Sequence, residues 1–496
     1  MEGTRPHSTM KPFNLFLVLL LLAGSVGVFY ITMRPGIKRS VQLENRQFYL
    51  DGKPFFPLAV NYMASTQFDG QTMWPLSAFD YHENQHETRN RNDAHRQLLA
   101  EFTLIRDLGF NAIRFVGIGE PSIDEKGDGH LEVFTRSLDG EGISFDLRSD
   151  SALNIYFNAL DDLFNTASEA GLQVVYLIRL RPQFTSTSNL LRQFCKRFKD
   201  HPALMAIDIY NEPLYFDQPE KTKEEIYPIV KHWRKIIRTY APHKLVTIGL
   251  VGIREVFRWD PNILDVDFIS YHPYEYEPEQ VRNELYWYSK HTNKAWIVGE
   301  TSIPSDNDSV PYTDQAAFAE KTIRQALACG ASGYSWWQYK DVNWQKYHAS
   351  YMGFLNRTGY TINSKGDTIS GSLKPVAHEF KKAFQQWPAD TCLRLPNYAN
   401  YSSSTAFRLS GKVTDEKGRG IEGAVVLAWN EFWSHSYHTV TQQDGRFELL
   451  GSFPFYHWIA SAAGYTMVRG DVSPEEAVNT DSIPTVNMPD FIIRRF

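Results

Sequence analysis

Eight short apolar runs alternate with helical patterns between residue 41 and about residue 390, and this alternation constrains the fold more than any other feature. Each run is rich in β-branched or aromatic residues and is brief enough to be a buried parallel strand. The eight runs are 55–62, 111–116, 173–180, 204–212, 244–251, 268–274, 295–300 and 333–339. Eight strands that alternate with helices over about 340 residues predict an α/β fold, the (β/α)8 barrel.

The segments between these runs repeat apolar residues at helical spacing, and three of them end at a glycine. The predicted helices are 94–108, 151–170, 190–199, 223–240, 278–291, 313–329 and 373–386, while the connection at 253–257 is left unassigned. A doubly wound open sheet is the alternative architecture. It would ordinarily need fewer strands and a glycine-rich phosphate turn, and no GxGxxG motif follows the first strand.

Three connections are much longer than the others: 63–93, 117–150 and 340–370. In a barrel they would stand at the carboxyl-end mouth, where active sites are built. We therefore interpret them as walls around a cleft, with tolerated surface insertions as the alternative.

Two glutamates end predicted strands, Glu212 in Asn211-Glu212-Pro213 and Glu300 after Gly299. Side chains at the carboxyl ends of barrel strands converge on one mouth. A pair of carboxyl groups there is what a retaining glycoside hydrolase needs. One carboxyl protonates the departing glycosidic oxygen, and the other attacks the anomeric carbon. A single glutamate at a strand end is more often structural, so the pair carries the prediction.

Several longer motifs strengthen this interpretation. They are 108–115 (LGFNAIRF), 208–213 (DIYNEP), 272–274 (HPY), 298–300 (VGE), 336–338 (WWQ) and the opening 48–54 (FYLDGKP). Together they resemble the cellulase-type clan of glycoside hydrolases, above all the family that includes endoglucanases and β-mannanases. The resemblance covers about 340 residues and implies a (β/α)8 barrel.

The resemblance implies a role for seven residues. Glu212 would be the general acid/base and Glu300 the nucleophile. Five others would position the sugar or the carboxyl groups: Asn211 at the sugar 2-hydroxyl, Arg114 and Tyr274 beside the nucleophile, His272 beside the acid/base, and Trp337 as a stacking floor. A buried structural ion pair is the alternative for Arg114, and a core pair is the alternative for His272 with Tyr274. Trp336 should point away and pack against helices.

One position departs from the family pattern. Many members carry a histidine near the end of the third strand, whereas this chain has Arg179 and Arg181. We expect one of these arginines to enter the cleft instead. The departure bears on the choice of substrate and leaves the two-carboxylate chemistry unchanged.

The C-terminal part changes character. Residues 391–406 have the proline, asparagine and serine content of a linker, and 407–496 contain short strands around Asp-Gly-type turns. This pattern predicts an all-β sandwich. The elements at 411–415 and 444–447 resemble the carboxypeptidase-regulatory, transthyretin-like domain. Its dense aromatic residues are expected to pack in a core or dock onto the barrel, with a second sugar-binding surface as the alternative.

Residues 13–33 form an apolar run without a charged residue, long enough to cross a bilayer as a helix. Its length and bulky end favour an uncleaved signal anchor over a cleaved signal peptide. Positive charges flank both sides, so they do not set the orientation. We therefore expect residues 1–40 to be a tail and a single-pass anchor. Residues 41–390, the hydrolase domain, would lie on the extracytoplasmic side.

Charge and cysteine spacing argue against nucleic acid as a partner and against a structural metal site. The formal net charge is −6 and no Lys/Arg block recurs, which argues against nucleic acid. Cys195, Cys329 and Cys392 are widely spaced, so no structural metal site is expected, and no cofactor is implied. The odd cysteine number leaves the redox compartment open. The oligomeric state is not indicated.

The expected function is therefore a retaining glycosidase that cleaves β-linked glycans of the β-mannan or β-glucan type, with a poly- or oligosaccharide as its partner. An inactive barrel that acts as a membrane-anchored carbohydrate-binding or adhesion protein is one alternative. A transglycosylase with the same residues is another, because the two activities differ only in whether water or sugar intercepts the intermediate.

Overall fold

The computed structural model describes residues 41–79, 90–118, 122–123, 131–182, 186–213, 221–253, 259–274, 278–343, 350–382, 391–393, 406–432 and 436–496. The anchor expected at about 13–33 lies outside these residues. Within them, no helix is both long enough and apolar enough to cross a membrane.

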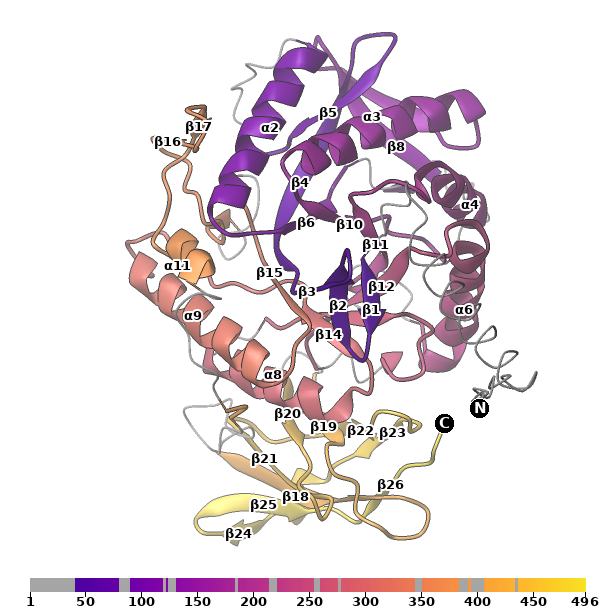
Figure 1. Ribbon diagram of the computed structural model, residues 1–496. Coiled ribbons are helices and arrows are strands. Elements are labelled where there is room, and N and C mark those ends of the chain that lie inside the picture. The colour runs from indigo at the N-terminus through magenta and orange to yellow at the C-terminus, as the bar shows by residue number, and fades with distance from the viewer. Residues whose placement is uncertain are drawn as a thin grey trace, which may run out of the picture. The chain divides into compact units, whose positions relative to one another are not determined.

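Eight parallel strands close into a barrel, which confirms the predicted fold (Figure 1). They are β4 (Leu58–Phe68), β6 (Ala112–Val116), β10 (Gln173–Leu177), β11 (Leu204–Asn211), β12 (Leu245–Val251), β13 (Phe268–His272), β14 (Ala295–Val298) and β15 (Gly333–Trp336). Each strand pairs with the next, and β15 pairs with β4 to complete the ring. An open doubly wound sheet is therefore excluded.

Helices surround this barrel, as Figure 1 shows. They are α2 (Arg91–Asp107), α3 (Asp150–Glu169), α4 (Thr187–Phe198), α6 (Lys223–Tyr240), α8 (Pro278–His291), α9 (Tyr312–Ala328) and α11 (Val376–Lys382). Local capping explains some of their bounds. Thr222 and Glu225 form a reciprocal capping box that starts α6 where the sequence predicts it.

All three long connections contain strands that the sequence analysis did not predict. β4 continues to Phe68, six residues beyond its expected end, and pairs with β5 (Met73–Ser77). The connection after β6 holds β7 (Ser122–Ile123), β8 (Leu131–Ser137) and β9 (Gly142–Asp146), and β8 pairs with β4. The β4–β8 pairing joins residues about 70 positions apart, so local sequence patterns do not reveal it. The third connection forms a hairpin, β16 (Tyr360–Ile362) and β17 (Thr368–Ser370).

A small antiparallel sheet covers the end of the barrel at which the strands begin. It consists of β1 (Gln42–Glu44), β2 (Gln47–Leu50) and β3 (Lys53–Phe55). Phe48 is fully buried there and meets the ring of Phe268 edge-on, at the first residue of β13. Figure 1 shows this sheet across the centre of the ring. Among the described residues, side chains therefore close this end of the barrel.

The C-terminal region forms two sheets, as the sequence predicts. One contains β18 (Phe407–Thr414), β21 (Arg446–Gly451), β24 (Val478–Thr480), β25 (Ile483–Asn487) and β26 (Phe491–Ile492). The other contains β19 (Val425–Trp429), β20 (Ser436–Val440), β22 (His457–Ser461) and β23 (Val468–Asp471).

Strand β19 is buried on both faces. Val426 and Ala428 belong to the sandwich's own core, whereas the alternate residues Val425, Leu427 and Trp429 belong to the core that includes the barrel. Polar contacts accompany this packing: Trp287 of α8 donates its indole N–H to the Gly423 carbonyl at 3.1 Å. Most aromatic residues of the sandwich therefore serve packing, although Phe432 is 77% exposed.

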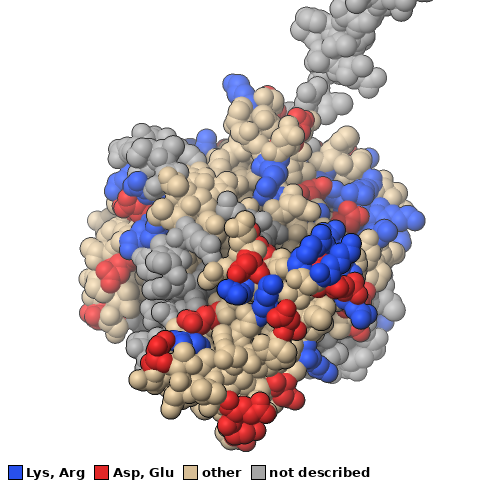
Figure 2. Space-filling model, turned by 90° about the horizontal axis from the view of Figure 1, so that it is seen from below, with Lys and Arg blue, Asp and Glu red and all other residues tan. Residues whose placement is uncertain are grey.

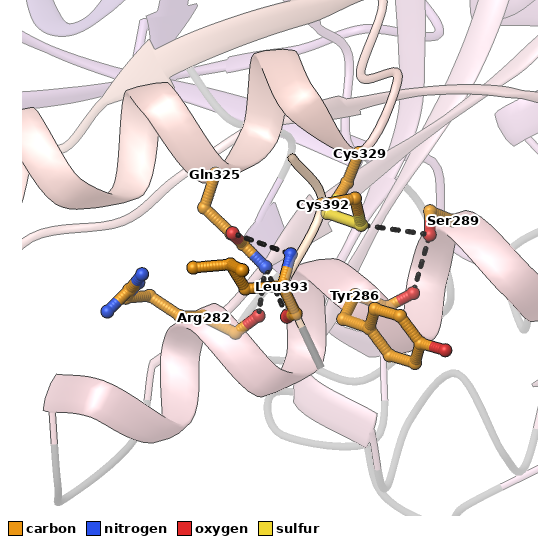
Figure 3. The surroundings of a disulfide bond; sticks show 7 residues. All are labelled: Arg282, Tyr286, Ser289, Gln325, Cys329, Cys392 and Leu393. Atoms are coloured by element: carbon orange, nitrogen blue, oxygen red, sulfur yellow. Dashed lines mark hydrogen bonds between the residues drawn. A yellow bond between two sulfur atoms is a disulfide. The ribbon is translucent and has the colours of Figure 1, made fainter. Parts of the chain in front are cut away.

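A disulfide joins Cys329, at the end of α9, to Cys392, in the segment that leads to the sandwich (Figure 3). The Gln325 side chain holds the same segment by accepting from the Leu393 N–H and donating to its carbonyl. The third cysteine, Cys195, is buried and free. The cross-link fastens the predicted linker to the barrel at its first residues.

Replacing Cys392 with serine is expected to lower the free energy of unfolding by about 2–4 kcal/mol. The bond closes a segment with a sequence separation of 63 residues and restricts the unfolded chain. Denaturant unfolding would measure the change. Reducing agent should destabilise the wild type and leave the variant unaffected; equal stability of the two oxidised proteins would contradict the expectation.

Charge is mixed over the face shown in Figure 2, where Lys and Arg side chains alternate with Asp and Glu side chains. No continuous field of either sign covers the coloured residues of this face. Such a field is what steers proteins to nucleic acid.

Candidate active site

The structure brings Glu212 and Glu300 together at the carboxyl ends of β11 and β14. One oxygen of each carboxyl group and one ring nitrogen of His272 all lie within 4.8 Å of one another. Both glutamates are buried, with 7% and 5% of their surface exposed. The two carboxyl groups can therefore act on neighbouring atoms of one bound molecule.

Glu212 owes its direction to an irregular strand end. The β11–β12 register shifts between Asp208 and Asn211, and Glu212 has a left-handed backbone with φ of 43°. Such a conformation costs on the order of 1–3 kcal/mol for a residue other than glycine, and strain of this kind gathers at functional sites. Burial raises the pKa of Glu212 to about 7, against the lowering effect of the Arg114 and Arg179 charges. A carboxyl group in this state can hold a proton near neutral pH.

Glu300 is surrounded by donors. Arg114 Nη1 donates to its Oε1, and the Tyr274 hydroxyl donates to its Oε2 at 3.3 Å. Burial raises the pKa of Glu300, while the charge of Arg114 and its hydrogen bond oppose that rise. Burial and the Glu300 charge raise the pKa of Tyr274, so its phenol remains a donor.

The Arg114 guanidinium contacts four side chains. Nε and Nη2 reach Asp208, both at 2.9 Å, and Nη1 reaches Asn61 at 2.8 Å as well as Glu300. Nη2 also donates to the Asn211 amide oxygen at 2.7 Å. The guanidinium thus links two predicted site residues, Asn211 and Glu300, in one network.

Asn61 and Asp208 were missed as site residues by the sequence analysis. Asn61 is fully buried, and its amide nitrogen donates to the Gly299 carbonyl and the Ser335 hydroxyl. The available signal was a polar residue inside an otherwise apolar predicted strand, such as Asp208 in LMAIDIYN.

His272 lies between the two carboxyl groups. Its Nδ1 is 2.7 Å from Glu212 Oε1 and 3.6 Å from Glu300 Oε1, and its Nε2 is 3.3 Å from the Ser270 hydroxyl. Burial lowers the pKa of His272 to about 4, so the ring is neutral near pH 7. Glycines make room for the ring, because a Cβ at Gly249 or Gly299 would approach it within 3.0 Å.

The tryptophan pair separates as expected. Trp336 is fully buried against Phe318 of α9 and Phe380 of α11. Trp337 is half-buried, and its backbone N–H donates to the carbonyl of Thr301, which follows Glu300. The backbone of Trp337 is thus bonded to the segment that carries Glu300.

Arg179 and Arg181, near the end of the third predicted strand, also differ in their surroundings. Arg179 has a φ of 47°, which interrupts the register between β10 and β11, and its charge acts on Glu212. Arg181 instead lines a hollow of about 260 Å³ with residues of α4 and α6, among them Ser188 and His232. Of the two arginines, Arg179 is therefore the one whose charge acts on Glu212.

Among the described residues, one cluster has the geometry to hold a metal ion, namely Glu212, His272 and Glu300. The guanidinium of Arg114 already supplies a positive charge to Glu300, and His272 already contacts Glu212. The arrangement is therefore complete as a network of hydrogen bonds.

Comparisons with known proteins agree with this geometry. Residues 84–341 match the family described as cellulase (glycosyl hydrolase family 5), and residues 408–485 match the carboxypeptidase regulatory-like domain. A relative from Aspergillus terreus, named "Probable mannan endo-1,4-beta-mannosidase C", is 27% identical over 268 residues. The match covers 48% of this chain and 61% of that relative.

Similar solved structures include a family 5, subfamily 18 protein from Streptomyces cattleya in complex with Manβ1-4GlcNAc. It is 15% identical, with a TM-score of 0.45, and the match covers 65% of this chain and 80% of that one. An exo-β-1,4-mannosidase from an Opitutaceae bacterium is 16% identical, with a TM-score of 0.48, and the match covers 69% of this chain and 62% of that one.

Proposed function

Since the chain belongs to the cellulase family (glycosyl hydrolase family 5) and is therefore a glycosidase, we propose that it cleaves β-linked glycans of the mannan or glucan type with retention of configuration. The observation that carries the proposal is the proximity of the Glu212 and Glu300 oxygens, within 4.8 Å. Retaining enzymes hold their carboxyl groups about 5–5.5 Å apart, whereas inverting enzymes separate them by about 6.5–9.5 Å to admit a water.

In the proposed reaction, Glu300 attacks the anomeric carbon while Glu212 gives its proton to the departing glycosidic oxygen. Arg114 and Tyr274 hold the attacking carboxylate in place through hydrogen bonds to its two oxygens. Water then enters, Glu212 takes a proton from it, and the covalent bond to Glu300 is broken.

His272 sets the position of the acidic proton in this proposal. If the Ser270 hydroxyl donates to Nε2, then Nδ1 carries the ring hydrogen and donates to Glu212 Oε1. The Glu212 proton then resides on Oε2. Asn211 would bond the sugar 2-hydroxyl, and Trp337 would stack on the ring of the bound sugar.

A panel of β-mannans, β-glucans and their oligosaccharides tests the substrate class. Proton NMR of the first-formed sugar tests the stereochemistry, because retention yields the β anomer before mutarotation. Release of the α anomer would overturn the double displacement, and turnover of none of the panel would overturn the substrate class.

We expect a plot of kcat/KM against pH to be bell-shaped, with activity lost above about pH 7. Glu212 must be protonated, and its pKa is raised to about 7, so activity is lost as the pH rises through that value. Glu300 must be ionised, and its pKa is also raised, so activity is lost on acidification earlier than for an ordinary carboxyl. Initial rates between pH 4 and 9 would measure both limbs. An alkaline limb well above pH 8 would contradict the assignment of Glu212.

We also propose that residues 13–33 anchor the protein in a membrane as a single pass, with the hydrolase domain on the extracytoplasmic side. The apolar run supports the anchor, and the Cys329–Cys392 disulfide supports an oxidising compartment. Fractionation of cells that produce the full chain, with protease added from outside, would test both parts.

A further inference from the structure

Asp208 lies on β11, four residues before Glu212, and none of its surface is exposed. Its Oδ2 accepts a hydrogen bond from Nε of Arg114 at 2.9 Å and forms an ion pair with Nη2 at the same distance. Its Oδ1 has no hydrogen-bond partner among the described residues. The carboxylate therefore forms a two-pronged contact with one edge of the guanidinium and with nothing else described.

A buried charge with an unpaired oxygen is a poor source of stability. Desolvation of two charges costs several kcal/mol, and apolar replacements of buried ion pairs are often neutral or stabilising. Stability alone thus gives little reason for an aspartate at this point of an apolar strand. Its contact with Arg114 offers a reason, because Arg114 also bonds Glu300 and Asn211.

Because of the shape of the guanidinium, the contact with Asp208 sets the direction of the other Arg114 hydrogen bonds. The group is planar and presents its donors as a rigid fork. With Nε directed at Asp208, the two terminal nitrogens donate to Asn61, Glu300 and Asn211. Without the carboxylate, rotation about the side-chain bonds of Arg114 would release all three contacts together.

Asp208 also acts on Glu212 through its charge. The groups around Glu212 are Arg114 on β6, Arg179 after β10, His272 on β13, Tyr274 after β13 and Glu300 after β14. The positive charges of Arg114 and Arg179 lower the pKa of Glu212, and the negative charge of Asp208 raises it. Asp208 raises the pKa of His272 in the same way.

We propose that Asp208 is a positioning residue for the glycosidase reaction, which orients Arg114 toward Glu300 and Asn211 and offsets the cationic charge near Glu212. The inference rests on the proposed function, in which these two glutamates and Asn211 act on the sugar. Asp208 touches no substrate in this role and acts only through Arg114 and through its charge.

The test replaces Asp208 with asparagine, which keeps the shape and removes the charge. We expect kcat/KM to fall by about 10- to 100-fold, the size of effect that misplacement of a reacting group produces. The alkaline limb of the pH profile should move to lower pH, because the charge that raises the pKa of Glu212 is gone. Replacing Arg179 with glutamine should move that limb the opposite way.

The matched control is Asp267→Asn. Asp267 also pairs with an arginine, Arg234, but it lies just before β13, at the end of the barrel opposite the mouth. This variant should lose stability at most and should keep the wild-type pH profile. A shift of the limb in the control would mean that the profile reports general stability.

Carboxyl NMR of protein labelled in its glutamate side chains follows Glu212 without any substrate. A lowered Glu212 pKa in the folded Asp208→Asn protein supports the proposal even where no glycan of the panel is cleaved, which separates it from a failure of the proposed function. An unchanged Glu212 pKa with kcat/KM within twofold of wild type overturns it. Loss of thermal stability with an unchanged pH profile also overturns it.

Discussion

Replacing Glu300 with glutamine is expected to reduce kcat/KM by about 10⁴-fold or more, while the fold remains. An amide cannot attack the anomeric carbon to form the covalent intermediate, and loss of a nucleophile removes that order of rate in other enzymes. Hydrolysis of the best glycan of the panel measures the loss. Near-wild-type activity would rule out Glu300 as the nucleophile.

The matched control is Glu101→Gln. Glu101 is also buried, with 2% of its surface exposed, but it lies on α2 and accepts from the Tyr62 hydroxyl. Its replacement should change stability and leave catalysis near the wild-type rate. A comparable loss of activity in both variants would show that the Glu300 result reflects folding.

A second variant, Glu300→Ala, distinguishes a missing nucleophile from a damaged site. The truncation leaves space for a small anion such as azide on the face opposite the leaving group. Azide should then restore cleavage of an activated aryl β-glycoside and yield the inverted α-glycosyl azide. Rescue that gives the β product would assign the nucleophile's position elsewhere.

Replacing Glu212 with glutamine is expected to lower turnover of natural glycans by about 10²- to 10⁴-fold, the usual contribution of general acid–base catalysis. Natural sugar leaving groups need a proton, which glutamine cannot give. Dinitrophenolate needs none, so the first step with dinitrophenyl β-glycosides should survive and the second should become limiting. A burst of dinitrophenolate, followed by slow turnover, is the expected observation.

The same loss with both kinds of leaving group would contradict an acid/base role for Glu212. The pH profile gives an independent check, because the limb near pH 7 belongs to Glu212 and should disappear in the variant. Persistence of that limb would assign it to another group.

Much of the barrel was predictable because its signals are local. The apolar runs that form β6 and β12 begin within one residue of their predicted starts and end where predicted, and α6 has its predicted bounds. The paired glutamates followed from strand ends in the same way. Periodicity and capping act within a few residues, so they are visible without knowledge of the fold.

Other features depend on contacts between distant residues and were not predictable. The extension of β4 pairs with β5 and β8, and β8 lies about 70 residues away. The Cys329–Cys392 bond joins two of three cysteines whose spacing carried no signal. Asp208 looked like part of a strand motif until its contact with Arg114 appeared.

The sequence by itself determined the eight barrel strands, the helices between them and that two glutamates end barrel strands, because side-chain periodicity and turn chemistry are local properties. Only the tertiary structure decided that these glutamates meet within 4.8 Å, that burial raises the pKa of Glu212 to about 7, and that the charge of Arg179 acts on Glu212. Distance and burial depend on how separate strands pack together, and no single segment of the chain specifies that packing.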